Sequence, residues 1–345
     1  MIMDGLTILK YLQYHPQSSR NEIAEGTQFE GSDATLKRLL ASQIAAGNIL
    51  VSGQGKATRY GLTSVCHLTM PIDIDTYFHH DQDERQIQST FNFELLADMP
   101  PSLSLFTDEE MQQLDSLQAQ FQMNMSELSP TTYRKEMERL GVDLSWKSSQ
   151  IEGNTYSLLE TERLLRESKT ASGKTQEEAV MLLNHKHTLR FLLDNKDYLK
   201  ELSIRRIEDI QSLLVEGLDT EKGLRHRRVG ITGTNYRPLD NEFQIREALE
   251  STCSIINQRQ NVFEKALLAL LLISYIQPFT DGNKRTSRLV CNGILMANNY
   301  CPISFRTVDS IDYKKAMLIF YEQNNIVPFK EIFISQYKFA VEEYF

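Results

Sequence analysis

Two strongly apolar segments flank the stretch Gln277-Pro278-Phe279-Thr280-Asp281-Gly282-Asn283-Lys284-Arg285-Thr286-Ser287-Arg288. Residues 263–276 before it are rich in Leu and Ala and contain no Gly or Pro, and residues 289–298 resume an apolar helical pattern. Both segments predict buried helices, because a helix that is apolar on every face needs protein on every side. The polar stretch between them is predicted to be the turn that joins them.

The composition of this turn suits a phosphate group. Asp281 offers a carboxylate to a hard cation such as Mg²⁺, and Gly282 lets backbone amides curve around an anion. The following helix opens with three cations, which are Lys284, Arg285 and Arg288. At that end of a helix the unpaired amides and the dipole already favour negative charge. We therefore predict a phosphate site, with an ordinary solvated loop as the alternative.

Length and composition indicate a globular chain. With 345 residues, 41% of them hydrophobic, it can bury a large core in two or three domains. Residues 1–10 lack the pattern of a signal peptide, and the longest apolar run, residues 266–276, is far shorter than the ~18 residues of a spanning helix. We expect a cytoplasmic protein with no membrane partner. The net charge of −9 argues against a protein that coats nucleic acid.

Residues 1–64 are predicted to form a module of their own. Amphipathic helices are indicated at residues 6–12 and 19–24 and from residue 32 to about 46. Two short β-like runs follow, at residues 49–51 and 58–60, around the turn Gly53-Gln54-Gly55. Three helices and a two-stranded wing resemble a winged helix-turn-helix domain.

That resemblance implies contacts with DNA, because the third helix of such domains enters the major groove and the wing approaches phosphate. The candidate residues are Thr35, Lys37 and Arg38 on the helix and Lys56 and Arg59 on the wing. Residues 1–64 carry six basic and five acidic side chains, so their balance is only +1. This weak balance leaves DNA binding open beside a role in protein contacts or dimerisation.

Residues 65–104 lose the helical period and gather acidic and histidine side chains between residues 73 and 84. His79 and His80 beside these carboxylates suggest a metal site, but adjacent side chains on an extended chain point in opposite directions. We therefore expect a solvated connector.

Residues 105–345 are predicted to be helical except near residues 223–238. Thr107 caps the first helix, and another spans residues 131–140 and ends at Gly141. A further helical stretch, residues 143–154, carries the only tryptophan, Trp146, and places Ser148 and Glu152 one turn apart. The predicted fold class is therefore mainly α, with a winged module followed by a large helical body.

The interruption at residues 223–238 alternates short β-like pieces with glycines and has four arginines within fifteen residues. It is predicted to be a hairpin flap whose exposed backbone pairs with an extended peptide by strand addition. The residues assigned to this target-docking flap are Arg225, Val229, Ile231 and Gly233. A basic surface hairpin without that role is the alternative.

The turn, the basic hairpin before it and the helix end at residues 148–153 together resemble the Fic family. The hallmark of that family is H-x-F-x-[D/E]-G-N-[G/K]-R-x-x-R between two helices, and residues 277–288 match every defined position except the first. The resemblance covers roughly residues 105–340. Family members typically transfer AMP from ATP to a hydroxyl of a target protein. ATP with Mg²⁺ and a protein target that the sequence does not identify are therefore implied.

The resemblance assigns roles within the turn. Asp281 looks like the Mg²⁺ ligand, and Gly282 and Asn283 with the amides after them resemble the cradle for the α- and β-phosphates. Arg285 and Arg288 look like phosphate clamps. Phe279 resembles the buried anchor of the turn, and Lys284 occupies the position at which many members have glycine.

Three residues, Ser148, Glu152 and Gly153, match the family's inhibitory motif [S/T]-x-x-x-E-[G/N]. In members with this motif the glutamate pairs with the second arginine of the hallmark, here Arg288, and keeps the γ-phosphate from a reactive pose. A charge-assisted ion pair that competes with phosphate for one guanidinium explains this inhibition physically. A purely structural ion pair is the alternative.

Gln277 stands where the family has its catalytic histidine. A carboxamide has no accessible basic form, whereas histidine titrates near neutrality. A general base contributes about 10²–10⁴-fold to a rate, so we expect nucleotide binding with impaired transfer. His226 on the flap is a minor candidate for the missing base. Lys284 admits a kinase-like alternative, since some members with lysine there transfer the γ-phosphoryl group.

Two main functions stay open. One is an autoinhibited nucleotidyltransferase homologue, and the other is a catalytically inactive, nucleotide-sensing regulator that binds DNA. Helical bodies of this kind often form homodimers, although no apolar stripe in the sequence requires one.

Overall fold

The computed structural model describes residues 5–97 and 99–345; residues 1–4 of the predicted N-terminal module and residue 98 of the predicted connector lie outside the description. The N-terminal elements are α1 (Gly5–Tyr14), α2 (Arg20–Gly26), α3 (Asp33–Ala45), β1 (Ile49–Ser52), the 3₁₀ turn Gly55–Ala57 and β2 (Arg59–Leu62). Three short helices follow, α4 (Ser64–Thr69), α5 (Ile74–Phe78) and α6 (Phe93–Ala97). The body begins with α7 (Asp108–Glu127), α8 (Pro130–Ile151), α9 (Leu158–Glu167), α10 (Gln176–Asp194), the 3₁₀ turn Lys196–Leu199 and α11 (Ile204–Leu214). It ends with α12 (Glu242–Gln258), α13 (Val262–Ile276), α14 (Asn283–Ala297), α15 (Ser310–Gln323) and α16 (Val327–Tyr344).

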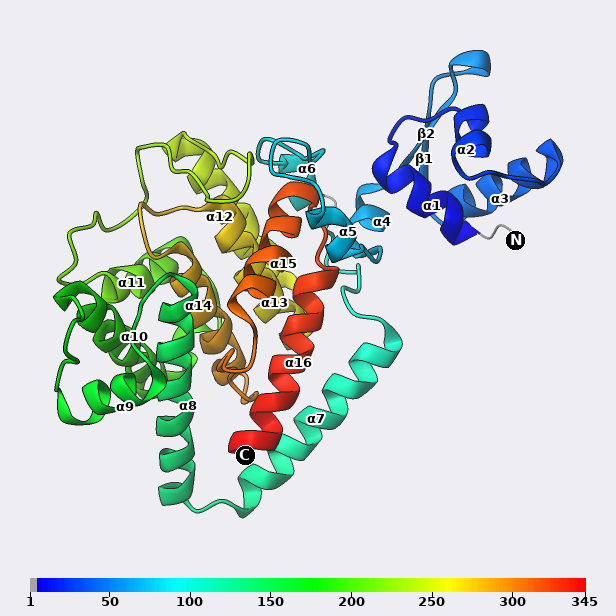
Figure 1. Ribbon diagram of the computed structural model, residues 1–345. Coiled ribbons are helices and arrows are strands. Elements are labelled where there is room, and N and C mark those ends of the chain that lie inside the picture. The colour runs from blue at the N-terminus through cyan, green and yellow to red at the C-terminus, as the bar shows by residue number, and fades with distance from the viewer. Residues whose placement is uncertain (1–4, 98) are drawn as a thin grey trace.

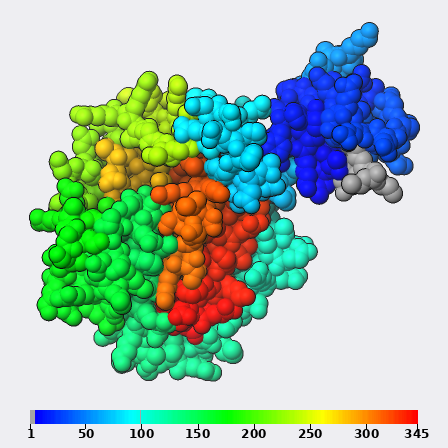
Figure 2. Space-filling view, viewed as in Figure 1, coloured from blue at the N-terminus to red at the C-terminus, as the bar shows by residue number. Residues whose placement is uncertain are grey.

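The N-terminal elements form a separate lobe (Figures 1 and 2). Ser19 and Glu22 form a capping box at the start of α2, and the Ser32 hydroxyl accepts from the amide of Thr35 at the start of α3. The strands pair antiparallel, with Ile49 opposite Leu62. This order of three helices and two strands is the predicted one. The lobe has its own apolar core, whose buried members are Ile8, Leu9, Leu12, Ile23, Leu36, Leu40, Ile49, Cys66 and Met70.

The segment after the lobe, predicted to be a solvated connector, is exposed over most of residues 71–90, but a few of its side chains pack on the body. Tyr77 and Phe91 are buried, and the Phe91 ring stacks on Tyr275 of α13 with 4.8 Å between centroids. Arg85 pairs with Glu322 of α15 at 3.0 Å, and both side chains are almost completely buried. Burial of these few aromatic side chains holds the segment against the body. Its acidic and histidine side chains between residues 73 and 84 stay exposed.

The body is built around α13. Every residue of this helix except Val262 and Lys265 is buried, as the uninterrupted apolar sequence requires. It packs against α12, α14 and α15, and Figure 1 shows α7, α8 and α16 along the outside of this group. In the described part of the chain, no helix combines the length and apolar character needed to cross a bilayer.

Helix α8 continues through Gly141, where the sequence predicts an end. A mid-helix glycine costs about 1 kcal/mol relative to alanine. Here the missing side chain lets α10 approach, since a Cβ at Gly141 would lie 3.0 Å from Cδ2 of Leu189. The predicted helices at residues 131–140 and 143–154 are therefore one helix, and it carries Ser148 and Glu152 to the turn that precedes α14.

The buried Arg85–Glu322 ion pair is expected to contribute to the stability of the fold. Arg85→Met leaves the buried Glu322 carboxylate without its cation, and we expect a loss of about 3–5 kcal/mol in the free energy of unfolding, measured with urea. Arg190→Met is the control, because Arg190 pairs with Asp194 on the exposed surface of α10. It is expected to change the free energy by less than about 1 kcal/mol. Equal losses in the two variants would contradict the prediction.

Candidate functional site

The turn between α13 and α14 has a backbone that its sequence explains. Gln277 ends α13 in the left-handed conformation, with φ 51°, and its amide donates to the carbonyl of Ile273. Gly282 precedes α14 with φ 84°, which glycine adopts without strain. The chain thus reverses direction within six residues and presents the start of α14 toward the end of α13.

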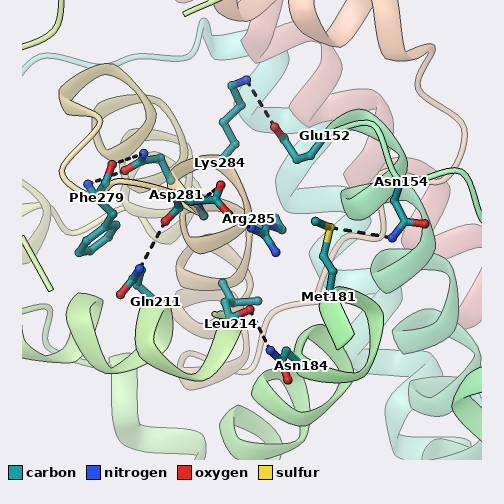
Figure 3. A network of polar contacts seen from close by, with 12 residues as sticks. Glu152, Asn154, Met181, Asn184, Gln211, Leu214, Phe279, Asp281, Lys284 and Arg285 are labelled. Carbon is teal, nitrogen blue, oxygen red and sulfur yellow. Dashed lines mark hydrogen bonds and ion pairs between the residues drawn. The ribbon is translucent and has the colours of Figure 1, made fainter. Parts of the chain in front are cut away.

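Asn283 locks this turn. Its side-chain oxygen accepts from the amide of Phe279 and its side-chain nitrogen donates to the carbonyl of Phe279, both at 2.8 Å. The Phe279 ring is completely buried, and Figure 3 shows it pointing away from Lys284 and Glu152. The structure therefore places Asn283 as a brace of the cradle, whose amide group is already occupied.

A cavity of about 180 Å³ lies in front of α14. Its lining residues are Glu152, Val229, Gly230, Gln277, Thr280, Asp281, Gly282, Asn283, Lys284 and Arg285. No side chain caps the first turn of α14 in the described structure, so its amides and the positive end of its dipole face this cavity. The volume suits phosphate groups but is below the roughly 300 Å³ at which pockets for larger ligands begin.

Asp281 and Arg285 form an ion pair at one wall of the cavity. Asp281 Oδ2 lies 2.7 Å from Arg285 Nη2, and the Asp281 side chain is half exposed whereas that of Arg285 is buried. The Nη1 atom of Arg285 is buried without a hydrogen-bond partner in the described structure. Gln211 of α11 supports the turn by donating to the Asp281 carbonyl at 3.3 Å (Figure 3). The sequence did not predict a role for Gln211, because it lies in an amphipathic helix, α11, that carries no recognised motif.

The chemistry of the donor set limits the metal that this site accepts. Within residues 5–97 and 99–345 no group of three or more His, Cys, Asp or Glu side chains is arranged to hold an ion. Mg²⁺ commonly takes one or two protein carboxylates and completes its shell with phosphate oxygens and water. Asp281, half exposed at the cavity, fits that role only together with a bound phosphate.

Arg288 is the most constrained residue of the site. Its side chain is fully buried, and Nε donates to the Ser148 hydroxyl at 2.8 Å. Nη2 donates to the Ser148 carbonyl at 2.9 Å and to Glu152 Oε1 at 2.8 Å. Its guanidinium carbon lies 5.3 Å from the centre of the Tyr313 ring. The structure thus brings the two sequence-predicted groups, the helix end of α8 and the second arginine of the turn, into direct contact.

Glu152 has a second cation. Its Oε2 lies 3.4 Å from Lys284 Nζ, while its Oε1 contacts Arg288, so one carboxylate spans two of the three cations that open α14 (Figure 3). Burial alone would raise the pKa of Glu152, but Arg288, Lys284 and Arg285 hold it below its usual value. The carboxylate is therefore ionised and occupies the place of an anion. Gly153 follows with φ 100° and turns the chain away.

The side chain of Gln277 is turned back onto α13. Its Nε2 donates to the Ser274 carbonyl at 2.6 Å, and the residue is only 7% exposed although it lines the cavity. A carboxamide held in this way offers no proton acceptor comparable to imidazole. His226 does not take its place, since its side chain is 70% exposed and Nδ1 contacts Glu242 at 3.0 Å.

The predicted hairpin does not form. Residues 223–238 contain no strand, and only an isolated parallel bridge joins Arg237 to Thr90. Hairpin pairing fails because this segment is held from outside: the Arg237 amide donates to Ser89, and the Arg85 guanidinium donates to the Gly233 carbonyl. The segment keeps the name flap below.

The four flap residues assigned to target docking do not share one surface in the structure. Val229 lies at the cavity, and Ile231 and Gly233 are half-buried beside it in the chain. Arg225 is 1% exposed, so its assignment to a docking surface is wrong. It is buried because its guanidinium binds backbone carbonyls inside the molecule, including that of Gln277.

The DNA candidates all lie in the N-terminal lobe. Lys37 and Arg38 on α3 and Lys56 in the turn between the strands are exposed, whereas Thr35 and Arg59 are half-buried. Lys37 pairs with Asp33 at 3.0 Å, and Arg59 donates to the carbonyls of Lys56 and Thr58. The winged-helix assignment and the role in DNA binding stay predictions.

His185 of α10 is a buried neighbour of the arginines that sequence reasoning did not single out. Its Nδ1 lies 3.3 Å from the Ser145 hydroxyl, which donates to the Gly141 carbonyl, so Nδ1 is the protonated nitrogen. Burial, reinforced by Arg288 and Arg285, lowers the pKa of His185 to about 3. The ring is therefore neutral and adds no positive charge beneath the site. A lone histidine in an amphipathic helix carries no sequence signal for this position.

Comparison with known proteins agrees with this geometry. Residues 201–295, which include the flap and the turn, match the family model of the Fic/DOC family. The chain is 28% identical over 180 residues to protein adenylyltransferase fic-1 of Caenorhabditis elegans, covering 50% of this chain and 35% of that protein. It is 29% identical over 175 residues to protein adenylyltransferase Fic of Nematostella vectensis, covering 49% and 40%. The chain thus matches little more than a third of the length of these relatives.

Solved structures show the same fold. Fic-1 from C. elegans superposes with a TM-score of 0.60 at 23% identity, over 68% of this chain and 72% of that one. A Fic family protein from Desulfovibrio desulfuricans G20 gives a TM-score of 0.57 at 19% identity, over 71% and 75%. Residues 201–295 therefore match the Fic/DOC family model and lie within a larger helical body that shares the fold of these structures.

The buried His185 predicts a pH dependence of stability. The unfolded imidazole has a pKa near 6.5, so between pH 6.5 and about 3 the unfolded chain binds a proton that the folded chain excludes. The contribution of His185 to the free energy of unfolding is fully present above pH 6.5. Below that pH it falls with a slope of up to about 1.4 kcal/mol per pH unit. Urea unfolding at pH 7 and pH 5 should show a smaller loss for His185→Gln than for wild type, by roughly 2 kcal/mol. His187→Gln, on the exposed face of the same helix, should keep the wild-type loss; identical losses in all three proteins would refute the assignment.

Proposed function

With the Fic domain at residues 201–295 as the premise, we propose that the chain is an autoinhibited homologue of protein adenylyltransferases. The observation that carries the proposal is the contact of Glu152 with Arg288 and Lys284 in front of the uncapped first turn of α14. A carboxylate that takes the place of a phosphate on two cations is what an internal inhibitor requires. The curated relatives named as adenylyltransferases support AMP transfer as the reaction.

The proposed substrate is ATP. Its phosphates would meet the amides of α14 together with Lys284, Arg285 and Arg288, and Asp281 would hold Mg²⁺ against them. Bound Mg²⁺ supplies positive charge that neutralises the phosphates during transfer. The present cavity of about 180 Å³ is too small for a whole nucleotide, which supports the proposal that Glu152 must withdraw before ATP takes a reactive pose.

The proposed acceptor is a hydroxyl of a protein that docks beside the flap. Residues 226–232 make no backbone-to-backbone hydrogen bond in the described structure, where the Arg227 carbonyl accepts from the Arg225 side chain. Val229 and Gly230 line the cavity. An extended segment pairing with this backbone would bring its own hydroxyl to the phosphates. The weak element of the reaction is Gln277, whose amide cannot accept the proton of that hydroxyl.

The proposal is tested by removing the Glu152 carboxylate and by placing a histidine at position 277. We compare wild type, Glu152→Gly, Gln277→His and the double variant for self-labelling and for labelling of lysate proteins with ATP. The double variant should label about 10²–10⁴-fold faster than Glu152→Gly, because it regains the general base. Label on the α-phosphate reports AMP transfer, whereas label on the γ-phosphate alone reports the kinase-like alternative.

Calorimetric titration of ATP with Mg²⁺ is the control for this experiment. Asp281→Ala should weaken binding, and Glu136→Gln, a carboxylate at the far end of α8 that pairs with Arg139, should not. If the double variant binds ATP and transfers nothing, the transferase proposal fails. If it does not bind ATP, the phosphate site itself is wrong.

The second candidate is a nucleotide-sensing regulator that binds DNA without turnover. Gln277 favours it, since an amide in the place of a base leaves binding intact, and so does the separately cored N-terminal lobe. The regulator should bind duplex DNA with an affinity that falls linearly with the logarithm of salt concentration and changes on addition of ATP. Arg38→Ala should lower the slope by about one, and Lys200→Ala on the body should not. Absence of DNA binding in both nucleotide states rules this candidate out.

A further inference from the structure

Arg225 makes four hydrogen bonds to backbone carbonyls, two of which join the flap to the turn before α14. Its Nε donates to the Gln277 carbonyl at 2.6 Å, and its own amide donates to the Pro278 carbonyl at 3.0 Å. Its Nη1 donates to the Arg227 carbonyl at 2.7 Å, and its Nη2 donates to the Leu239 carbonyl. One side chain therefore connects both ends of the flap to the end of α13.

The burial of Arg225 is unusual for a charge. The residue is 1% exposed, and no carboxylate forms an ion pair with it in the part of the chain that the structure describes. Burying an unpaired charge costs several kcal/mol unless its donors are satisfied. Here backbone carbonyls satisfy the three nitrogens of the guanidinium. A hydrophobic residue would fill the same space at lower cost, so the arrangement points to a requirement for these contacts.

Two of the four carbonyls that Arg225 binds belong to Gln277 and Pro278, the residues that directly follow α13. The last carbonyls of a helix lack intrahelical donors, and Gln277 holds a left-handed conformation with φ 51° without being glycine. The Nε bond to the Gln277 carbonyl stabilises that conformation. It thereby fixes the direction in which the side chain at position 277 leaves the backbone, beside the cavity.

We infer that Arg225 is a positioning residue. It fixes the backbone at position 277, from which the side chain leaves beside the cavity, and it holds the flap at a set distance from the turn before α14. The inference rests on the proposed transfer function and names the residue that organises its reacting groups. Arginine suits this role because its planar group carries five donors in fixed directions and reaches three carbonyls at once. Lysine places a single point charge there and cannot keep the same geometry.

The test uses the full chain carrying Glu152→Gly and Gln277→His, with and without Arg225→Lys. We expect kcat for AMP transfer to fall about 10–100-fold, because a displacement near 1 Å of a reacting group costs that order of rate. KM for ATP should stay within about threefold, since the phosphate-binding groups lie on α14 and not on the flap. A rise in KM with unchanged kcat would show that Arg225 serves binding alone and would overturn the inference.

Hydrogen exchange supplies a readout that does not depend on activity. In the wild-type background Arg225→Lys should raise exchange in peptides covering residues 224–240 and 274–282, while the thermal midpoint reports whether the fold persists. Arg246→Lys, on the exposed face of α12, is the matched control and should change neither. Unchanged exchange, or a lower thermal midpoint with unchanged kcat per folded molecule, would mean that Arg225 does not position the turn. If the background variant transfers nothing, the proposed function fails and exchange alone decides the role of Arg225.

Discussion

The structure of the site depends on one guanidinium that has no contact with solvent. Arg288 is fully buried, and a charge in that position is tolerated only when charged or polar groups surround it. Ser148 and Glu152 come from α8, and the ring of Tyr313 comes from α15. Helix α14 must therefore sit where α8 and α15 meet. The Nη1 atom of Arg288 has no hydrogen-bond partner in the described structure, and the bonds made by the other two nitrogens hold α14 against α8.

The same arrangement lines the cavity with hydrogen-bond donors and positive charge. The first turn of α14 has no side-chain cap, and three cations stand beside it. The turn that leads into it is held by Asn283, by the buried ring of Phe279 and by Gln211. Donors that are fixed in advance lose little conformational entropy when a ligand binds. Glu152 pairs with two of these cations from within the chain.

The flap lies between two buried arginines that act at different places. Arg225 attaches its ends to the turn, and Arg85 attaches its later part, at Gly233, to Glu322 of α15. Asn235 is held from the same side by Gln82 and Asp83. Residues 82–90 follow the N-terminal lobe in the chain, so the segment that leads from this lobe also buttresses the flap.

Local sequence patterns predicted many of the helices and strands of this structure. Apolar runs and capping residues predicted α13, α14, α7 and the elements of the N-terminal lobe, because helix period and caps are properties of short segments. The polar turn with its cations predicted the phosphate cradle for the same reason. The pairing of Glu152 with Arg288 was implied by resemblance, since 136 residues separate them in the chain and no local rule joins them.

What the sequence determined by itself is the chemistry available: an uncapped, cationic helix start, a glycine with positive φ, and a carboxamide in the place of a base. Tertiary structure decided how that chemistry is held. It continued α8 through Gly141 because α10 packs there, packed a few side chains of residues 73–92 onto the body, and replaced a predicted hairpin with a loop fastened from both sides. It also turned Arg225 from an apparent surface cation into the buried link between flap and turn. These outcomes depend on which distant groups can satisfy a buried donor or fill a space, and short-range periodicity does not encode that information.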